Sequence, residues 1–149
     1  AWWTAVNVAR AHVTGAGFDM YSPVIFSRFA PDPRDIHAAH SIYFQVLGEH
    51  GFIGLFLFLA IWWSVWRMAR SITNYKSTDP NLLWAKQLAA MCQVSLVGYF
   101  VGGAFLSLAY FDLPYNLLVM TVLTKRWLIQ AEAGPVRDQK AFVTQAPAM

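Results

Sequence analysis

Long apolar segments dominate the hydrophobic pattern of the chain and predict helices that cross a membrane. Three such segments cover residues 41–66, 87–111 and 115–130, and the second of them contains no charged residue. An apolar segment of about 20 residues is long enough to cross the hydrocarbon core of a bilayer as a helix. The pattern therefore predicts an all-α fold, with about three transmembrane helices in a polytopic membrane protein.

The chain ahead of the first predicted span is more polar. Residues 1–13 place apolar side chains at helical spacing and predict a short amphipathic helix, which Gly15 and Gly17 would end. Residues 18–36 lack clear periodicity and contain three prolines and several aromatic side chains. A loop of this length is uncommon unless it is functional or disordered, and the aromatic residues favour an ordered one. Residues 1–40 are thus predicted to form a helix and a loop outside the membrane.

The remaining segments are predicted to be connections and a tail. Residues 67–86 form a polar connector between the first two predicted spans, and residues 112–114, Asp-Leu-Pro, are predicted to form a tight turn between the second and the third. From residue 131 onward the chain is small and polar with two prolines, which is typical of a disordered tail. The sequence is therefore divided into three regions, 1–40, 41–130 and 131–149.

Charged residues at the ends of the predicted spans indicate how they are oriented. Cytoplasmic connections of membrane proteins carry an excess of Lys and Arg. The connector and the end of the third span are basic, whereas the turn between the second and third spans is acidic: Arg67, Arg70, Lys76 and Lys86 against Asp79; Lys125 and Arg126; Asp112. The connector and the C-terminus are therefore predicted to be cytoplasmic, and residues 1–40 to lie on the outer side.

The composition agrees with a membrane protein in contact with a lipid bilayer. Hydrophobic residues make up 57% of the chain and charged residues only 13%, against about a quarter in soluble domains. The formal net charge of +3 is too small to indicate a nucleic-acid partner, and no basic run interleaves with aromatic residues. The chain opens on Ala-Trp-Trp without an initiator Met. We interpret it as a piece of a longer protein, whose missing N-terminal helices would be its partners.

His40 and Glu49 are the candidate catalytic residues. His40 lies where the loop meets the first predicted span, and an imidazole can take up or release a proton near neutral pH. The alternative is a histidine that caps the helix or hydrogen-bonds the loop. Glu49 lies near the membrane boundary, where an ionisable residue is a functional hypothesis, with a packing contact to a neighbouring helix as the alternative. On a continuous helix the two residues lie about 180° apart, so they are not expected to form an acid–base pair.

Three further polar residues precede the first span. Arg28 and Arg34 are candidates for binding a phosphate or a sugar acid, because a guanidinium group matches such groups with two hydrogen bonds. The alternative is a pair of solvated charges balanced by nearby aspartates. His37 and His40 have the i, i+3 spacing of two metal ligands on a helix, but no third ligand follows at a convincing spacing. No metal site and no cofactor are predicted.

The segment TGAGF, the Pro-rich aromatic loop after it, and AHSIYFQVLGEHGFIGLFLFL resemble the O-antigen ligase and polymerase superfamily of bacterial inner-membrane proteins. The similarity is greatest to the O-glycosylation ligases associated with exosortase systems. The family pattern is a histidine, a small polar residue, an aromatic pair, Leu, Glu, Gly and then an apolar span. The matching residues here are His40, Ser41, Tyr43, Phe44, Leu47, Glu49, Gly51 and Gly54.

The resemblance implies a glycosyltransferase of the cell envelope with many membrane helices and a large periplasmic loop. Such proteins transfer a glycan from an undecaprenyl-diphosphate carrier to the hydroxyl of an acceptor sugar or protein, without a metal. It implies a general-base or acceptor-positioning role for His40, and substrate binding by the loop arginines, His37 and Tyr43. Residues 1–40 would be periplasmic. An arginine that family members carry just before the Trp pair is absent, so the chain alone is expected to be inactive.

Other functions are compatible with parts of this pattern. A polysaccharide polymerase of the same superfamily would differ only in its acceptor. A transporter or flippase could use Glu49 and His50 as a proton relay, but it would need polar groups further along the span, and residues 51–63 contain none. A non-catalytic membrane segment, in which the ionisable residues serve only packing, is the third alternative.

Overall fold

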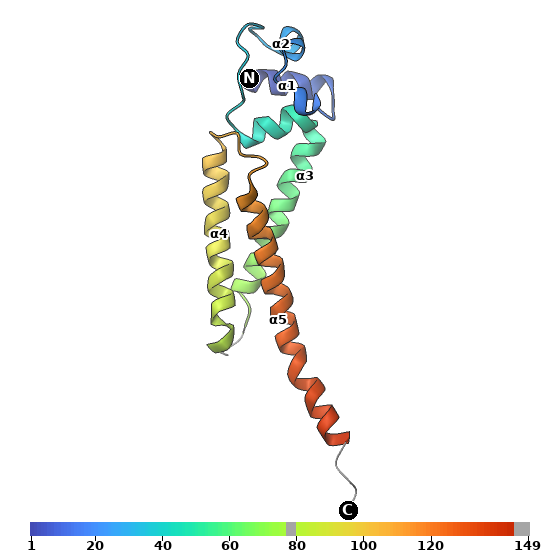
Figure 1. The fold of residues 1–149 in the computed structure, drawn as a ribbon, viewed down its shortest axis with the longest axis vertical. Coiled ribbons are helices and arrows are strands. Elements are labelled where there is room, and N and C mark those ends of the chain that lie inside the picture. Colours follow the sequence, from blue (N-terminus) through green and yellow to red (C-terminus); the bar gives the residue numbers. More distant parts are fainter. Residues whose placement is uncertain (77–79, 145–149) are drawn as a thin grey trace, which may run out of the picture.

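The computed structural model describes residues 1–76 and 80–144, and the side chains of 1–76, 80 and 82–131. All regular secondary structure in this part of the chain is helical, which confirms the all-α prediction (Figure 1). The helices are α1 (Trp2–Ala11), α2 (Pro23–Phe29), α3 (Ile42–Thr73), α4 (Leu83–Gly103) and α5 (Asp112–Thr144), with short 3-10 helices η1 (Gly17–Asp19) and η2 (Pro80–Leu82).

The helices form a small head on top of an elongated bundle (Figure 1). The head consists of α1, η1, α2 and the loop that follows, and Asn7 Nδ2 joins its two helices by donating a hydrogen bond to the carbonyl of Phe29 at 2.9 Å. α3 contacts α1 in the head and both α4 and α5 in the bundle. α1 and the C-terminal end of α5 lie at opposite ends of the molecule (Figure 1).

α3 is divided by a sharp bend at Gly51, whose backbone is not helical (φ 66°, ψ −164°). Residues 42–50 run across the base of the head, and residues 52–73 run down the bundle (Figure 1). The sequence predicted one continuous helix here, which is wrong. A Cβ atom on Gly51 would lie 1.9 Å from the carbonyl oxygen of Val13, so only glycine lets the loop after α1 approach this closely.

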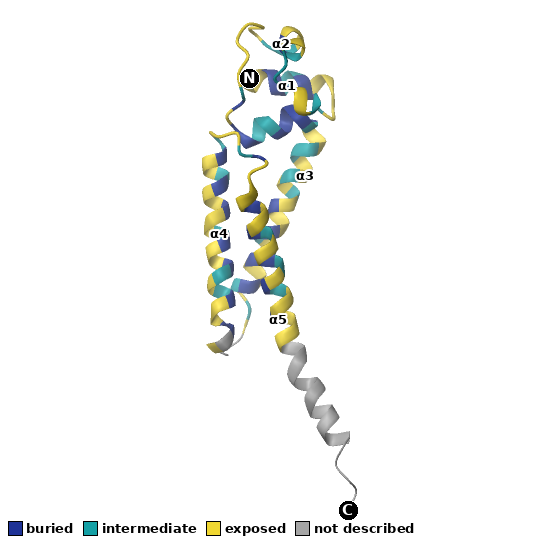
Figure 2. Ribbon diagram, viewed as in Figure 1, coloured by how far each residue is buried: buried dark blue, intermediate teal, exposed yellow. Residues whose placement is uncertain are grey.

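The bundle core lies where α3, α4 and α5 meet. Large side chains near its centre, such as Trp62 and Leu96, are almost completely buried. Most apolar side chains on the outward faces of the bundle are exposed instead, as the yellow ribbon segments indicate (Figure 2). Of the described helices, only α3 is long and apolar enough to cross a membrane. Its exposed apolar surface is the opposite of what a helix in the core of a soluble protein shows, and indicates association with a membrane.

Several predicted boundaries differ from the structure. α3 continues past Trp66 to Thr73, because Arg67 and Arg70 end the apolar segment without breaking the helix. The predicted second span, 87–111, is helical only to Gly103, and residues 104–111 form an irregular connection. A pair of glycines, 102 and 103, weakens the helix at that point.

Two further predictions about the C-terminal third are wrong. Asp112 and Pro114 belong to the first turn of α5, not to a tight turn. Proline is tolerated there because its missing N–H has no partner within the helix. α5 continues to Thr144, so residues 131–144 are helical where a disordered tail was expected. Residues 145–149 of that predicted tail lie outside the described part.

The head confirms the short N-terminal helix and adds one that was missed. α1 ends at Ala11, where His12 adopts an extended backbone, and the two glycines follow it rather than cap it. α2 occupies the middle of the loop expected over residues 18–36. Its start has a recognisable signal: Ser22 Oγ accepts a hydrogen bond from the N–H of Ile25, and Pro23 occupies the first helical position. Seven residues are too few for a clear periodic pattern.

Candidate functional site

The candidate site lies where the loop of the head joins α3. Both backbone polar groups of Ala39 are held by aromatic side chains. Trp2 Nε1 donates a hydrogen bond to the Ala39 carbonyl, and the Ala39 N–H donates to the Tyr21 hydroxyl at 3.3 Å. Ala39 is only 2% exposed, so this point of the chain is fixed against the head.

His40, the next residue, is exposed and has a left-handed backbone with φ 46°. It is the only non-glycine residue in the described part with a positive φ. Left-handed backbone is uncommon for such residues, although histidine tolerates it better than most, and it persists only where the surroundings hold it. The N-cap of α3 is Ser41, so His40 is not a cap. No hydrogen bond or ion pair of its ring occurs among the described residues.

Glu49 is buried at the end of the first part of α3, with only 4% of its surface exposed. Its Oε2 accepts a hydrogen bond from the Tyr110 hydroxyl, which lies in the connection between α4 and α5. His50 Nε2 lies 2.9 Å from the same hydroxyl oxygen. Because the hydroxyl proton is used by the carboxylate, this oxygen accepts from Nε2–H of His50. Phe18 packs edge-on against His50 and Tyr110, with ring centroids at 5.2 and 5.8 Å.

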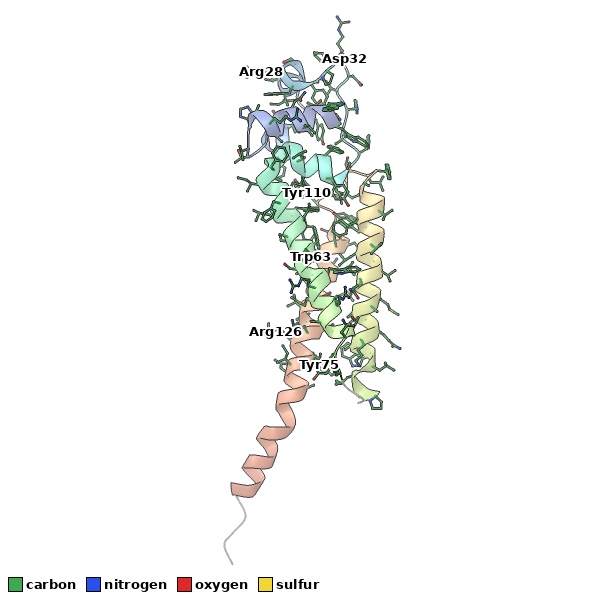
Figure 3. All side chains as sticks on the ribbon, turned by 180° about the vertical axis from the view of Figure 1, so that it is seen from behind. Arg28, Asp32, Trp63, Tyr75, Tyr110 and Arg126 are labelled. Carbon is green, nitrogen blue, oxygen red and sulfur yellow. The ribbon has the colours of Figure 1, made fainter. Side chains whose placement is uncertain are left out.

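This Glu49–Tyr110–His50 cluster joins the head, α3 and the connection between α4 and α5, and Tyr110 lies at the junction of head and bundle in Figure 3. Partial burial raises the pKa of Tyr110 above its usual range, and the hydrogen bond to Glu49 and that group's charge raise it further. The hydroxyl therefore stays protonated as a donor.

No hydrogen bond joins Glu49 to His40 in the described part. The geometry gives the buried Glu49 carboxylate a hydrogen-bond partner in the connection between α4 and α5.

A groove of about 480 Å³, here called the outer groove, opens on the head next to the segment that carries His40. α1 contributes Trp2, Trp3 and Thr4 to its lining, and the loop contributes Asp32, Asp35 and His37. His37 Nδ1 lies 3.0 Å from Asp35 Oδ1, so the carboxylate orients the ring. The sequence singled out His37 but neither the aspartates nor the tryptophans of this groove.

The other predicted substrate-binding residues lie elsewhere. Arg28, in the last turn of α2, and Arg34, in the loop, are exposed and are not among the described residues that line the outer groove (Figure 3 labels Arg28). Tyr43 faces α4: its hydroxyl donates to the carbonyl of Phe100 at 3.1 Å. It lines a separate aromatic groove of about 410 Å³ with Trp62 and Phe100. The structure therefore places His37 in the lining of the outer groove and Tyr43 against α4.

The described residues contain no group of three or more His, Cys, Asp or Glu side chains that could hold a metal ion. Comparison with known proteins adds no relative: no family model, curated protein or solved structure matches the chain.

Proposed function

We propose that this chain serves in a membrane glycosyltransferase of the O-antigen ligase type. The enzyme moves a glycan from an undecaprenyl-diphosphate carrier to an acceptor hydroxyl at the periplasmic face of the bacterial inner membrane. The observation that carries the proposal is His40, an exposed imidazole in a fixed left-handed backbone directly before an apolar helix. A lipid-linked donor and a water-soluble acceptor can meet at such a point.

The reaction needs a base and a means to stabilise the leaving group. In the proposed step the acceptor oxygen forms a bond to the anomeric carbon, while the bond from that carbon to the diphosphate oxygen breaks. The hydroxyl proton passes to the His40 imidazole, and the electron pair leaves with undecaprenyl diphosphate. Positive charge near the departing diphosphate lowers the barrier, and the exposed Arg28 and Arg34 are available for this role.

The distribution of charge supports a matching orientation in the membrane. Arg28 and Asp32 lie in the head, whereas Arg126 and Tyr75 lie at the far end of the bundle (Figure 3). The lower part of α3, residues 52–73, is about 33 Å long at 1.5 Å per residue, close to a hydrocarbon core of about 30 Å. In the proposed topology α3, α4 and α5 cross the inner membrane, with the head periplasmic and the basic end cytoplasmic.

Complementation with the intact gene in a ligase-deficient host tests the role of His40. We expect His40→Ala, His40→Asn and His40→Gly to lower glycan transfer about 100-fold or more, because general-base catalysis contributes 10²–10⁴. Asparagine and glycine accept a left-handed backbone, so these two variants should reach the membrane in normal amounts. Normal transfer by the glycine variant would remove the catalytic role of His40. Transfer lost only in step with abundance would make that role structural.

A further inference from the structure

The outer groove carries the chemistry of a sugar-binding site. Trp3 is 64% exposed at its edge, and Trp2 is fixed by its bond to Ala39 and by parallel stacking on Phe44 at 4.8 Å. Exposed indole rings are rigid, flat apolar surfaces on which the C–H face of a sugar can stack. Asp32 and Asp35 provide carboxylates, which only accept hydrogen bonds and so suit ligands rich in hydroxyl donors.

A buried hydroxyl in the lining also lacks a partner. Thr4 is completely buried, contributes to the outer groove, and its Oγ1 has no hydrogen-bond partner among the described residues. Buried polar atoms are almost always paired in folded proteins, because an unpaired one costs free energy. Thr4 Oγ1 has no exposed surface, so a hydroxyl-bearing ligand would pair with it only after the wall of the groove opens at this point.

The described side chains of the groove disfavour the phosphate end of the donor. Its described lining contains two carboxylates and one histidine but neither Arg nor Lys. A diphosphate placed there would meet like charges at short range, where repulsion is strong. Arg28 and Arg34 are exposed and do not line the groove.

The groove is also within reach of the proposed base. His37 lines it, and His40 follows three residues later, which an extended chain spans in about 10 Å. Trp2 connects the two directly, since it lines the groove and holds the carbonyl of Ala39. We infer that the outer groove is the acceptor subsite of the enzyme and binds an uncharged, hydroxyl-rich sugar. This inference rests on the proposed function for the sugar's role as acceptor.

Fluorine NMR of the intact protein labelled with 5-fluorotryptophan tests this inference, in a detergent without a sugar headgroup. The Trp3 signal is assigned with Trp3→Phe. Trp84 and Trp127, which contact each other at 4.7 Å between ring centroids, serve as reference signals and are assigned in the same way. The probes are maltotriose as a neutral sugar, trigalacturonic acid as an acidic one, inorganic pyrophosphate, and a short serine-containing peptide.

We expect maltotriose at millimolar concentration to shift the Trp3 signal and leave Trp84 and Trp127 unchanged. Asp35→Asn should weaken maltotriose binding at least fivefold. In hydrogen exchange, maltotriose should protect the backbone around residues 31–37 of the wild type, and Trp3→Ala should abolish this protection. Asp19→Asn, an exposed aspartate of η1 outside the groove, is the matched control and should bind like wild type.

Three results would overturn the inference: no shift with maltotriose, a stronger response to pyrophosphate, trigalacturonic acid or the peptide, or tighter binding after Asp35→Asn. The assay contains no donor, so it is independent of His40 chemistry. Loss of transfer in the His40 variants without maltotriose binding would leave the proposed function standing and remove the acceptor subsite. Maltotriose binding together with full transfer by His40→Gly would leave the sugar site standing and remove the catalytic role of His40.

Discussion

Tyr110 shows how much one hydroxyl contributes when its partner is a buried carboxylate. Glu49 is 4% exposed and its Oε2 accepts from this hydroxyl, so Tyr110→Phe leaves a charged acceptor buried without its donor. We expect a loss of about 1–3 kcal/mol in unfolding free energy. Thermal unfolding of the purified protein measures it, with Tyr75→Phe at the far end of the bundle as control.

A double-mutant cycle isolates the pair from other effects of removing the hydroxyl. In a Glu49→Gln background, the carboxylate charge is absent, so Tyr110→Phe should cost clearly less than in the wild type. Equal costs in both backgrounds would mean that Tyr110 stabilises the protein through its ring and not through Glu49.

The same contact predicts an alkaline limit to stability. Burial raises the pKa of Tyr110 and of Tyr21, and the nearby Glu49 charge adds to both shifts. The folded state therefore holds these protons more tightly than the unfolded state, in which tyrosine titrates at about 10. The stabilisation is complete below that pH and is lost as the pH rises through the folded values. Melting temperatures measured from pH 8 to 11 should fall steeply above about pH 10 in the wild type and less steeply in Tyr110→Phe. If the melting temperature of both proteins fell equally with pH, Tyr110 would not be the source of the alkaline limit.

The residue scale also shows where sequence analysis stops. His40 and Glu49 could be recognised, because an imidazole can exchange a proton near neutral pH and an ionisable residue at membrane depth is rare. Tyr110 could not be paired with Glu49, since 61 residues separate them and tyrosine is common in membrane proteins. The outer groove could not be predicted either, because Trp3, Asp35 and Thr4 converge on it from two elements.

At the scale of elements, the bend in α3 determines where the head lies. Gly51 has φ 66°, and a Cβ there would collide with the carbonyl of Val13 at 1.9 Å. We expect Gly51→Ala to destabilise the protein by more than about 2 kcal/mol, because strained backbone and overpacking add. Gly98→Ala is the matched control: a Cβ there meets nothing within 4 Å, so alanine should stabilise α4 by about 0.5–1 kcal/mol.

Both variants are compared by thermal unfolding and by hydrogen exchange of residues 12–17 and 48–51. Greater exchange in Gly51→Ala is expected at these two segments, because the loop after α1 contacts the bend through the hydrogen bond from the Ala16 N–H to the Gly48 carbonyl at 2.9 Å. A Gly51→Ala protein as stable as wild type would mean that α3 straightens without cost.

The long apolar helices were predictable, whereas the short helix α2 and the bend were not. Apolar segments and helix-forming residues are local properties, so α1, α3 and α4 were located to within several residues. The bend depends on the loop after α1, which packs on Gly51 from a distant part of the chain. Glycine in an apolar span is equally compatible with close helix packing, so the pattern alone could not distinguish the two.

At the scale of the molecule, the proposed topology makes one prediction: the head and the basic end lie on opposite sides of the membrane. Single cysteines are introduced at three exposed positions: Val24 in α2, Asn74 after α3 and Phe105 after α4. The background is Cys92→Ser, which removes the natural cysteine. A maleimide that cannot cross the inner membrane is added to intact cells and, separately, to permeabilised cells.

We expect Val24→Cys and Phe105→Cys to react in intact cells, and Asn74→Cys only after permeabilisation, because α3 and α4 each cross the membrane once in the proposed topology. Reaction at all three positions in intact cells would mean that α3 does not span, despite its length and apolar surface. Reaction of Val24→Cys but not of Phe105→Cys would leave α3 as a span and remove α4. We do not expect the second outcome, because Tyr110 follows Phe105 closely and must reach the base of the head to donate its hydrogen bond to Glu49.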